Sequence, residues 1–295
     1  VKSLTGGALA PYVASPVRLP GLCRTAFAGV GGVGLAQAPE VLRAEVLATL
    51  RVASFVSVRD HITRATLAQA GITARLLPDP ALLVADLFGR QIRQRAETGE
   101  LAAWRAAFAS GYLALQLGPE FADDACLDML AARLQAVLAA TGMRLVLFRA
   151  GLAPWHDDPA TLQRLAARLP ALPLRIMESA RLWDICALIA GSRACVASSL
   201  HARIVATAFG LPRLSLVPPG GSGQSRKLAA YLDAWERPGL PTCVEPAGLA
   251  EALLRALAAD ADALQRQAQS LSATCRAGLA RLSRAEGFSG PDRDS

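Results

Sequence analysis

The sequence has few aromatic residues and no long uninterrupted apolar run. Aromatic residues make up 5% of the 295 residues, whereas 53% are hydrophobic, so the core must be filled by aliphatic side chains. No apolar run reaches the roughly 18 residues that a transmembrane helix needs, and no basic segment followed by an apolar one opens the chain. We therefore expect neither a membrane span nor a secretory signal, and a cytoplasmic location.

Cysteine pairs at metal-ligand spacing are also missing. The six cysteines lie far apart, without a CxxC pair or a neighbouring histidine at zinc-binding spacing. We expect buried free thiols in a reducing compartment, no disulfide framework and no metal site.

The charge of the chain is basic but dispersed. Lys and Arg number 31 against 24 acidic residues, a formal net charge of +7. The arginines stand singly and no basic run is interleaved with aromatics, so a nucleic-acid partner is not expected. A basic balance of this kind suits small anionic substrates.

Segments typical of strands alternate with segments typical of helices, which predicts an α/β fold. We expect an N-terminal Rossmann-like domain over residues 1–105, including a connecting helix, a C-terminal one over 106–286, and a frayed tail over 287–295. Only three strands precede residue 79, so the first domain is expected to be incomplete in this sequence. The predicted strands of both domains lie at residues 25–30, 54–58, 74–77, 112–117, 143–149, 174–177, 194–197 and 213–217. The alanine-rich stretch 247–284 is expected to form one long helix.

Turns that follow strands are where ligands bind in parallel sheets. The glycines from Gly29 to Gly34 follow a strand, but no helix opens at once, so the dinucleotide fingerprint fails and a flexible turn is the simpler interpretation. A second turn follows the strand at 194–197 and holds Ser198 and Ser199. Either serine can cap a helix, and both are expected to contact the substrate. His201 then opens that helix, and its imidazole can project toward a ligand beside free backbone N–H groups.

Two motifs in this order resemble the polysaccharide pyruvyl transferase family. The first is Ser54-Phe-Val-Ser-Val-Arg-Asp60, followed by Leu67, Gly71 and Pro78-Asp-Pro80. The second runs from Ala194 to Pro212 and contains Ser-Ser-Leu-His, a short apolar helix and Gly-Leu-Pro. The resemblance covers residues 27–240. Many members carry an arginine where this chain has Ser199, so no cationic contact is expected at that position.

The resemblance implies two Rossmann-like domains in a GT-B-like arrangement and a transfer of pyruvate from phosphoenolpyruvate, as a ketal, onto a hexose. The acceptor would be a hexose of a capsular polysaccharide or exopolysaccharide, or of its precursor. This precursor could be linked to a lipid at the inner face of the membrane. No cofactor and no metal would be needed. His201 would be the catalytic residue, because a histidine titrating near neutral pH can give and take the protons of this reaction.

Further substrate-binding residues are expected at other turns. Arg59 ends a strand and can bind a carboxylate bidentately, whereas Asp60 is placed to cap the next helix. In the Gly-rich stretch 218–227, Arg226 and Lys227 can add charge to a phosphate site, with a solvated helix end as the alternative. His156 follows another strand and could bind sugar hydroxyls together with Asp157 or Asp158, with an ordinary exposed loop as the alternative.

Two other functions fit the same sequence. One is a nucleotide-sugar glycosyltransferase or epimerase of GT-B-like fold, because a fold does not fix a function. The other is a non-catalytic member that assists polysaccharide assembly, which Ser199 and the short first domain would suit.

Overall fold

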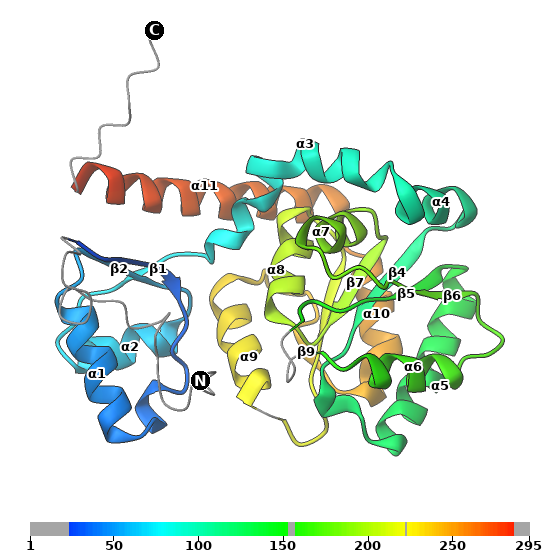
Figure 1. Ribbon diagram of the computed structural model, residues 1–295, viewed down its shortest axis with the longest axis horizontal. Helices are drawn as coiled ribbons and strands as arrows, with labels where there is room; N and C mark the ends of the chain where they lie inside the picture. The colour runs from blue at the N-terminus through cyan, green and yellow to red at the C-terminus, as the bar shows by residue number, and fades with distance from the viewer. Residues whose placement is uncertain (1–23, 153–156, 222, 286–295) are drawn as a thin grey trace, which may run out of the picture. The chain divides into compact units, whose positions relative to one another are not determined.

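The computed structural model describes residues 24–152, 157–221 and 223–285 (Figure 1). The chain divides into two compact units, each with its own parallel sheet. Unit 1 comprises Val1–Pro80 and Ala273–Ser295, and unit 2 comprises Ala81–Ser272.

Unit 1 is a small βα unit with a three-stranded parallel sheet in the order β1-β2-β3. Its core is aliphatic and centres on Val58 and Leu67, both fully buried. The three predicted strands of this region are all present. The elements are β1 (Ala26–Val30), η2 (Leu35–Gln37), α1 (Glu40–Arg51), β2 (Phe55–Val58), α2 (His61–Gln69) and β3 (Arg75–Leu76).

Unit 2 is larger, and its helices and strands alternate as the sequence predicts. A sixth strand, β9, adds to the five predicted ones. The elements are η3 (Pro80–Leu83), α3 (Val84–Ala96), α4 (Gly99–Ala107), β4 (Tyr112–Gln116), η4 (Pro119–Phe121), α5 (Asp124–Thr141), β5 (Arg144–Leu147), α6 (Pro159–Ala167), β6 (Leu174–Ile176), α7 (Leu182–Ala190), β7 (Ala194–Ala197), α8 (Leu200–Ala208), β8 (Arg213–Leu216), α9 (Gly223–Trp235), β9 (Cys243–Val244), η5 (Pro246–Gly248) and α10 (Leu249–Leu257). The last helix, α11 (Ala261–Ala285), begins in unit 2 and belongs to unit 1 from Ala273 onward.

The sheet of unit 2 has the strand order β6-β5-β4-β7-β8-β9, and every pairing is parallel. The chain thus winds outward in one direction from β4 and then in the other from β7. Such a doubly wound sheet leaves a crevice at the carboxyl ends of the two central strands, where the strand order reverses. In unit 2 the strand order reverses between β4 and β7.

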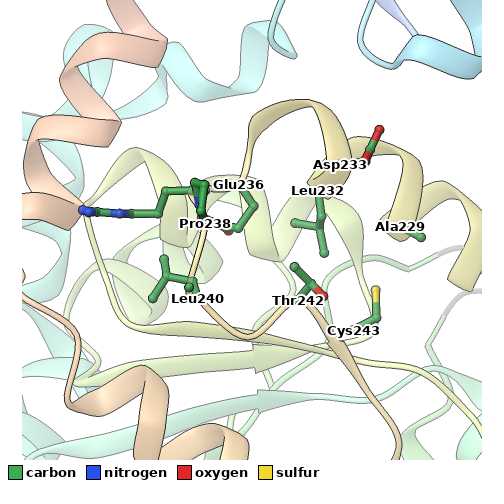
Figure 2. Close-up of a pocket in the computed structure, with 10 residues that line it drawn as sticks. Ala229, Leu232, Asp233, Glu236, Pro238, Leu240, Thr242 and Cys243 are labelled. Carbon is green, nitrogen blue, oxygen red and sulfur yellow. The ribbon is translucent and has the colours of Figure 1, made fainter.

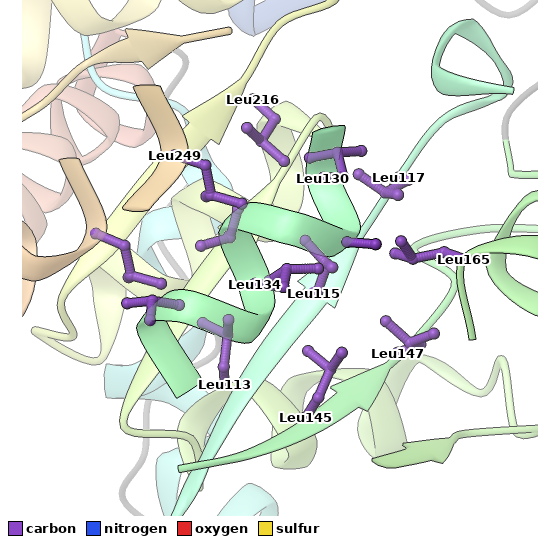
Figure 3. Close-up of a cluster of buried hydrophobic side chains, with 14 of the residues drawn as sticks. Leu113, Leu115, Leu117, Leu130, Leu134, Leu145, Leu147, Leu165, Leu216 and Leu249 are labelled. Carbon is purple, nitrogen blue, oxygen red and sulfur yellow. The ribbon is translucent and has the colours of Figure 1, made fainter. Parts of the chain in front are cut away.

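Apolar side chains cover both faces of this sheet. Side chains of a strand alternate between faces, so Leu113 and Leu115 of β4 join one core while Tyr112 and Ala114 join the other. Figure 3 shows the first core, in which α5 lies over β4 and β5. Gln116 ends β4 on the same side as Ala114, and it is the only polar residue of that strand besides the Tyr112 hydroxyl.

Two features of the chain differ from the sequence-based description. The region 247–284, predicted as one long helix, is broken into η5, α10 and α11. The break follows from Asp260, whose carboxylate accepts the backbone N–H of Asp262 at 3.0 Å and so competes with helix continuation. The region after Asp79, predicted as a partly helical connection, forms α3 and α4, which group with unit 2.

Among the described residues, no helix combines the length and the apolar character needed to cross a bilayer.

Candidate functional site

The turns that follow β4 and β7 lie at the switch point of the unit 2 sheet. Gln116, at the end of β4, is paired in register with Ala197, at the end of β7. Ser198 and Ser199 come next in the chain, and His201 is the second residue of α8. The predicted serine turn and histidine therefore stand at the switch point of a Rossmann-like sheet.

His201 is the exposed start of an otherwise buried helix. Residues 202–208 of α8 are buried, whereas the His201 side chain is exposed. Because backbone N–H groups at the start of a helix lack intrahelical partners, an imidazole here stands beside groups that favour an anion.

The two serines hold the turn itself. Ser199 caps α8, its hydroxyl accepting the Ala202 N–H at 3.4 Å, and Ser198 Oγ accepts the Gly118 N–H at 2.8 Å. Both side chains are buried. Their hydroxyls thus fix the backbone that carries His201, and their predicted contact with substrate stays a prediction.

A buried amide and a buried carboxylate support the serine turn from behind. Gln116 Oε1 accepts the Ser199 N–H at 2.8 Å, and Gln116 Nε2 donates to Asp157 Oδ1 at 2.6 Å. Asp157 Oδ2 accepts the N–H groups of Ala150 and Gly151, the latter at 3.0 Å. Asp157 therefore belongs to the interior of the site.

The other histidine region is only partly described. His156, predicted to bind sugar hydroxyls, lies outside the described residues. Asp158, its predicted companion, caps α6 and accepts the Ala160 N–H at 3.0 Å.

Arg226 and Lys227 lie on the next turn of the same sheet edge. β8 pairs with β7, so the loop after β8 emerges beside the loop that carries Ser198. That loop leads into α9 at Gly223, and both cations are exposed near the start of α9. Phosphate binding by these two residues stays a prediction.

Arg59 lies in unit 1, at the carboxyl edge of its three-stranded sheet. Arg59 Nη1 donates to Asp79 Oδ2 at 2.6 Å, and the guanidinium lies against Gly31, where an added Cβ would come within 2.7 Å of Arg59 Nε. Asp60 caps α2 by accepting the Thr63 N–H at 2.6 Å, which confirms its structural role.

The glycine turn of unit 1 is pinned rather than loose. Gly29 N donates to Ser57 Oγ and Gly32 N donates to Thr63 Oγ1, each at 2.8 Å. The predicted turn is present, and the hydroxyls of Ser57 and Thr63 hold its backbone at two positions, which the sequence did not indicate.

A buried ion network joins α8 to α9. Glu236 accepts from Arg203 Nη2 at 2.7 Å and from Arg213 Nη2 at 2.5 Å, and Arg213 also donates to Gln267 Oε1 at 2.6 Å. Burial acts to raise the pKa of Glu236, but the two guanidiniums outweigh it and lower this pKa to about 2. Glu236 is therefore ionised at neutral pH.

A pocket of about 350 Å³ lies beside this network (Figure 2). Its walls come from the last turns of α9, including Leu232, from Glu236 just after that helix, and from the segment through Leu240 to Cys243. None of the residues predicted to bind substrate lines it.

Within residues 24–152, 157–221 and 223–285, no three His, Cys, Asp or Glu side chains group as metal ligands.

The sequence did not point to three supporting residues, Gln116, Arg203 and Glu236. Gln116 carries a usable signal, since it is a polar amide at the end of an apolar strand that leads into a turn. Arg203 and its partner Glu236 lie 33 residues apart, and no spacing rule connects them.

Comparison with known proteins decides the family. The sequence profile for polysaccharide pyruvyl transferases matches residues 29–218, well over half of the chain and including both motifs. The chain belongs to the polysaccharide pyruvyl transferase family. The resemblance carried by the two motifs is thereby confirmed. No curated protein sequence matches this family member.

Solved structures similar to this family member are nucleotide-sugar enzymes. A UDP-GlcNAc 2-epimerase from Neisseria meningitidis has a TM-score of 0.53 at 12% identity, covering 86% of this chain and 68% of its own. A UDP-GlcNAc 2-epimerase from Methanocaldococcus jannaschii has 0.52 at 13%, covering 79% and 62%. A UDP-forming α,α-trehalose-phosphate synthase from Burkholderia xenovorans has 0.52 at 14%, covering 93% and 71%.

These likenesses show the fold alone. They confirm the predicted class, α/β with Rossmann-like units of the GT-B type. The chain spans between 58% and 71% of the length of the solved structures it resembles.

Proposed function

We propose that this family member transfers pyruvate from phosphoenolpyruvate onto a hexose of a polysaccharide precursor, where it is held as a cyclic ketal. The observation that carries the proposal is the position of His201, the exposed start of a buried helix at the switch point of the unit 2 sheet. Family membership supports the same reaction.

The reaction needs proton transfer at defined points. A proton is delivered to the methylene carbon of phosphoenolpyruvate while a sugar hydroxyl adds to the adjacent carbon and loses its own proton. Phosphate then leaves, and a second hydroxyl of the sugar attacks the same carbon and closes the ketal. His201 would serve as the general acid and base, a role worth about a hundredfold or more in rate.

Cations and helix starts would hold the anionic donor. Arg226 and Lys227 are exposed on α9 beside the His201 turn, and Lys and Arg are common phosphate binders. We further propose that Arg59 of unit 1 contacts a carboxylate or sugar hydroxyl, since its guanidinium lies at the carboxyl edge of that sheet. His156 remains a proposed sugar contact.

The test is incubation with phosphoenolpyruvate and a panel of lipid-linked and nitrophenyl hexosides, followed by mass spectrometry and a phosphate assay. The proposal expects an adduct with the mass of a pyruvyl ketal and one phosphate released per adduct. Without any use of phosphoenolpyruvate, release of a nucleoside diphosphate from a nucleotide sugar would instead indicate a glycosyltransferase. Conversion of a nucleotide sugar into its epimer would indicate an epimerase. No turnover with any acceptor would favour the non-catalytic alternative.

A further inference from the structure

We propose that Gln116 and Asp157 are positioning residues that set the orientation of His201 through the backbone of Ser199. This inference rests on the proposed function, because it concerns how His201 is placed for proton transfer. It adds two residues to the site, neither of which contacts the substrate in this account.

The connection runs through hydrogen bonds of fixed polarity. Asp157 Oδ1 accepts from Gln116 Nε2 at 2.6 Å, and Gln116 Oε1 accepts the Ser199 N–H at 2.8 Å. Ser199 is the residue before α8, and His201 is the second residue of that helix. The direction in which the chain enters α8 therefore depends on the Gln116 amide.

The amide cannot be turned around. The amide oxygen of Gln116 faces the Ser199 N–H, and the amide nitrogen faces the Asp157 carboxylate. If the two atoms were exchanged, the nitrogen would face another donor at Ser199 and the oxygen would face another acceptor at Asp157. Asp157 is held in turn, because its second oxygen accepts the N–H groups of Ala150 and Gly151. The orientation of one carboxylate thus determines the polarity of the whole connection.

Burial makes this connection stringent. Gln116 is 1% exposed and Asp157 is 7% exposed, so neither can exchange its protein partner for bulk water. Buried polar groups that lose a partner are strongly disfavoured, and a connected network responds as a unit. A change at Asp157 should therefore be felt at Ser199.

The test exploits a reversal of polarity in a double variant. In Gln116→Glu, a carboxylate faces Asp157. In Asp157→Asn, the nitrogen of the new amide faces a donor in either orientation. That donor is Gln116 Nε2 in one orientation and the N–H groups of Ala150 and Gly151 in the other. In the double variant the new asparagine oxygen accepts from Ala150 and Gly151, and the asparagine nitrogen donates to the carboxylate introduced by Gln116→Glu. That carboxylate still accepts the Ser199 N–H through its other oxygen.

Pyruvyl transfer is measured at about pH 8.5, which disfavours proton sharing between facing carboxylates. Each single variant should lower kcat about tenfold or more with little change in KM for phosphoenolpyruvate, since misplacing a catalytic group by about 1 Å can cost a hundredfold. The double variant should return kcat to within about threefold of the parent. A double variant as slow as the slower single variant, or single variants with the parental kcat, would overturn the inference.

The matched control is Tyr112→Phe, at the other end of β4. It removes a buried hydrogen bond from Tyr112 Oη to the Leu188 carbonyl, 2.7 Å long, and should lower the melting temperature with kcat unchanged. Should a single variant not fold, Gln116→Asn takes its place, since it keeps the amide on a shorter side chain. A folded Gln116→Asn with the parental kcat would equally overturn the inference.

A readout without substrate separates this inference from the proposed function. The ring resonance of His201, identified by its loss in His201→Gln, should shift in both single variants and return in the double variant, while Tyr112→Phe leaves it in place. An unmoved resonance in the single variants contradicts positioning. Failure of the parent chain to use phosphoenolpyruvate would count against the proposed function only.

Discussion

Arg203, two residues after His201 on α8, donates from Nη2 to Glu236 Oε2 at 2.7 Å. Both side chains are almost fully buried, as is Arg213, the second partner of this carboxylate. The helix that presents His201 is therefore fixed at its start by the serine turn and along its length by an ion network that reaches the end of α9.

This network predicts a pH-dependent stability. The pKa of Glu236 is about 2, below its ordinary value of 4.5, so its contribution is present above pH 4.5 and is lost as the pH falls toward 2. Glu236→Gln should lower the free energy of unfolding at pH 7 by about 3 kcal/mol. In denaturant titrations, the difference in the free energy of unfolding between the parent and Glu236→Gln should become smaller below pH 4.5.

The control for this prediction is Glu251→Gln, an exposed carboxylate on α10, which should change stability by less than about 0.5 kcal/mol. An equally small effect of Glu236→Gln would mean that the network contributes nothing.

The second prediction concerns the proposed phosphate contacts. Arg226→Ala and Lys227→Ala should each raise the KM for phosphoenolpyruvate severalfold and leave the melting temperature nearly unchanged, because both side chains are exposed. Added salt should reduce the difference in KM between each variant and the parent, since screening weakens the interactions of exposed charges. Arg255→Ala, an exposed cation on α10, is the control. Kinetics equal to the parent's would return these two residues to an ordinary solvated helix end.

The third prediction concerns the packing of the glycine turn against the Pro-Asp-Pro segment of unit 1. Gly29 has φ +63°, and an added Cβ would lie 2.4 Å from Pro80 Cδ, so Gly29→Ala meets both backbone strain and a collision. It should destabilise the protein by about 2 kcal/mol or more. Gly34→Ala, where an added Cβ meets nothing within 4 Å, should be nearly neutral in the same thermal denaturation. Equal effects of the two substitutions would refute the pinned turn.

Much of the fold was predictable because its information is local. The alternation of apolar segments located all eight predicted strands. Asp60, a capping residue before a segment with helical periodicity, indicated the start of α2. The break before α11 was missed because the alanine-rich stretch around it has high helix propensity, and a single Asp260 side chain decides the outcome.

The site was predictable only where a motif marks it. Ser198, Ser199 and His201 stand in one short run of sequence, so their shared turn follows directly. Gln116 hydrogen-bonds to Ser199, which lies 83 residues away in the sequence, and to Asp157, which lies 41 residues away. Such long-range pairings depend on the order of the strands in the sheet, which the sequence does not specify. Long-range polar contacts are therefore what the structure adds.

The central claim is that His201 carries proton transfer in a pyruvyl transfer from phosphoenolpyruvate. The most direct measurement is the rate of pyruvyl-adduct formation by His201→Ala beside the parent chain, with circular dichroism and melting to verify the fold. The account predicts a loss of about a hundredfold or more in kcat with the fold intact. A folded His201→Ala variant that forms the adduct at nearly the parental rate would contradict it.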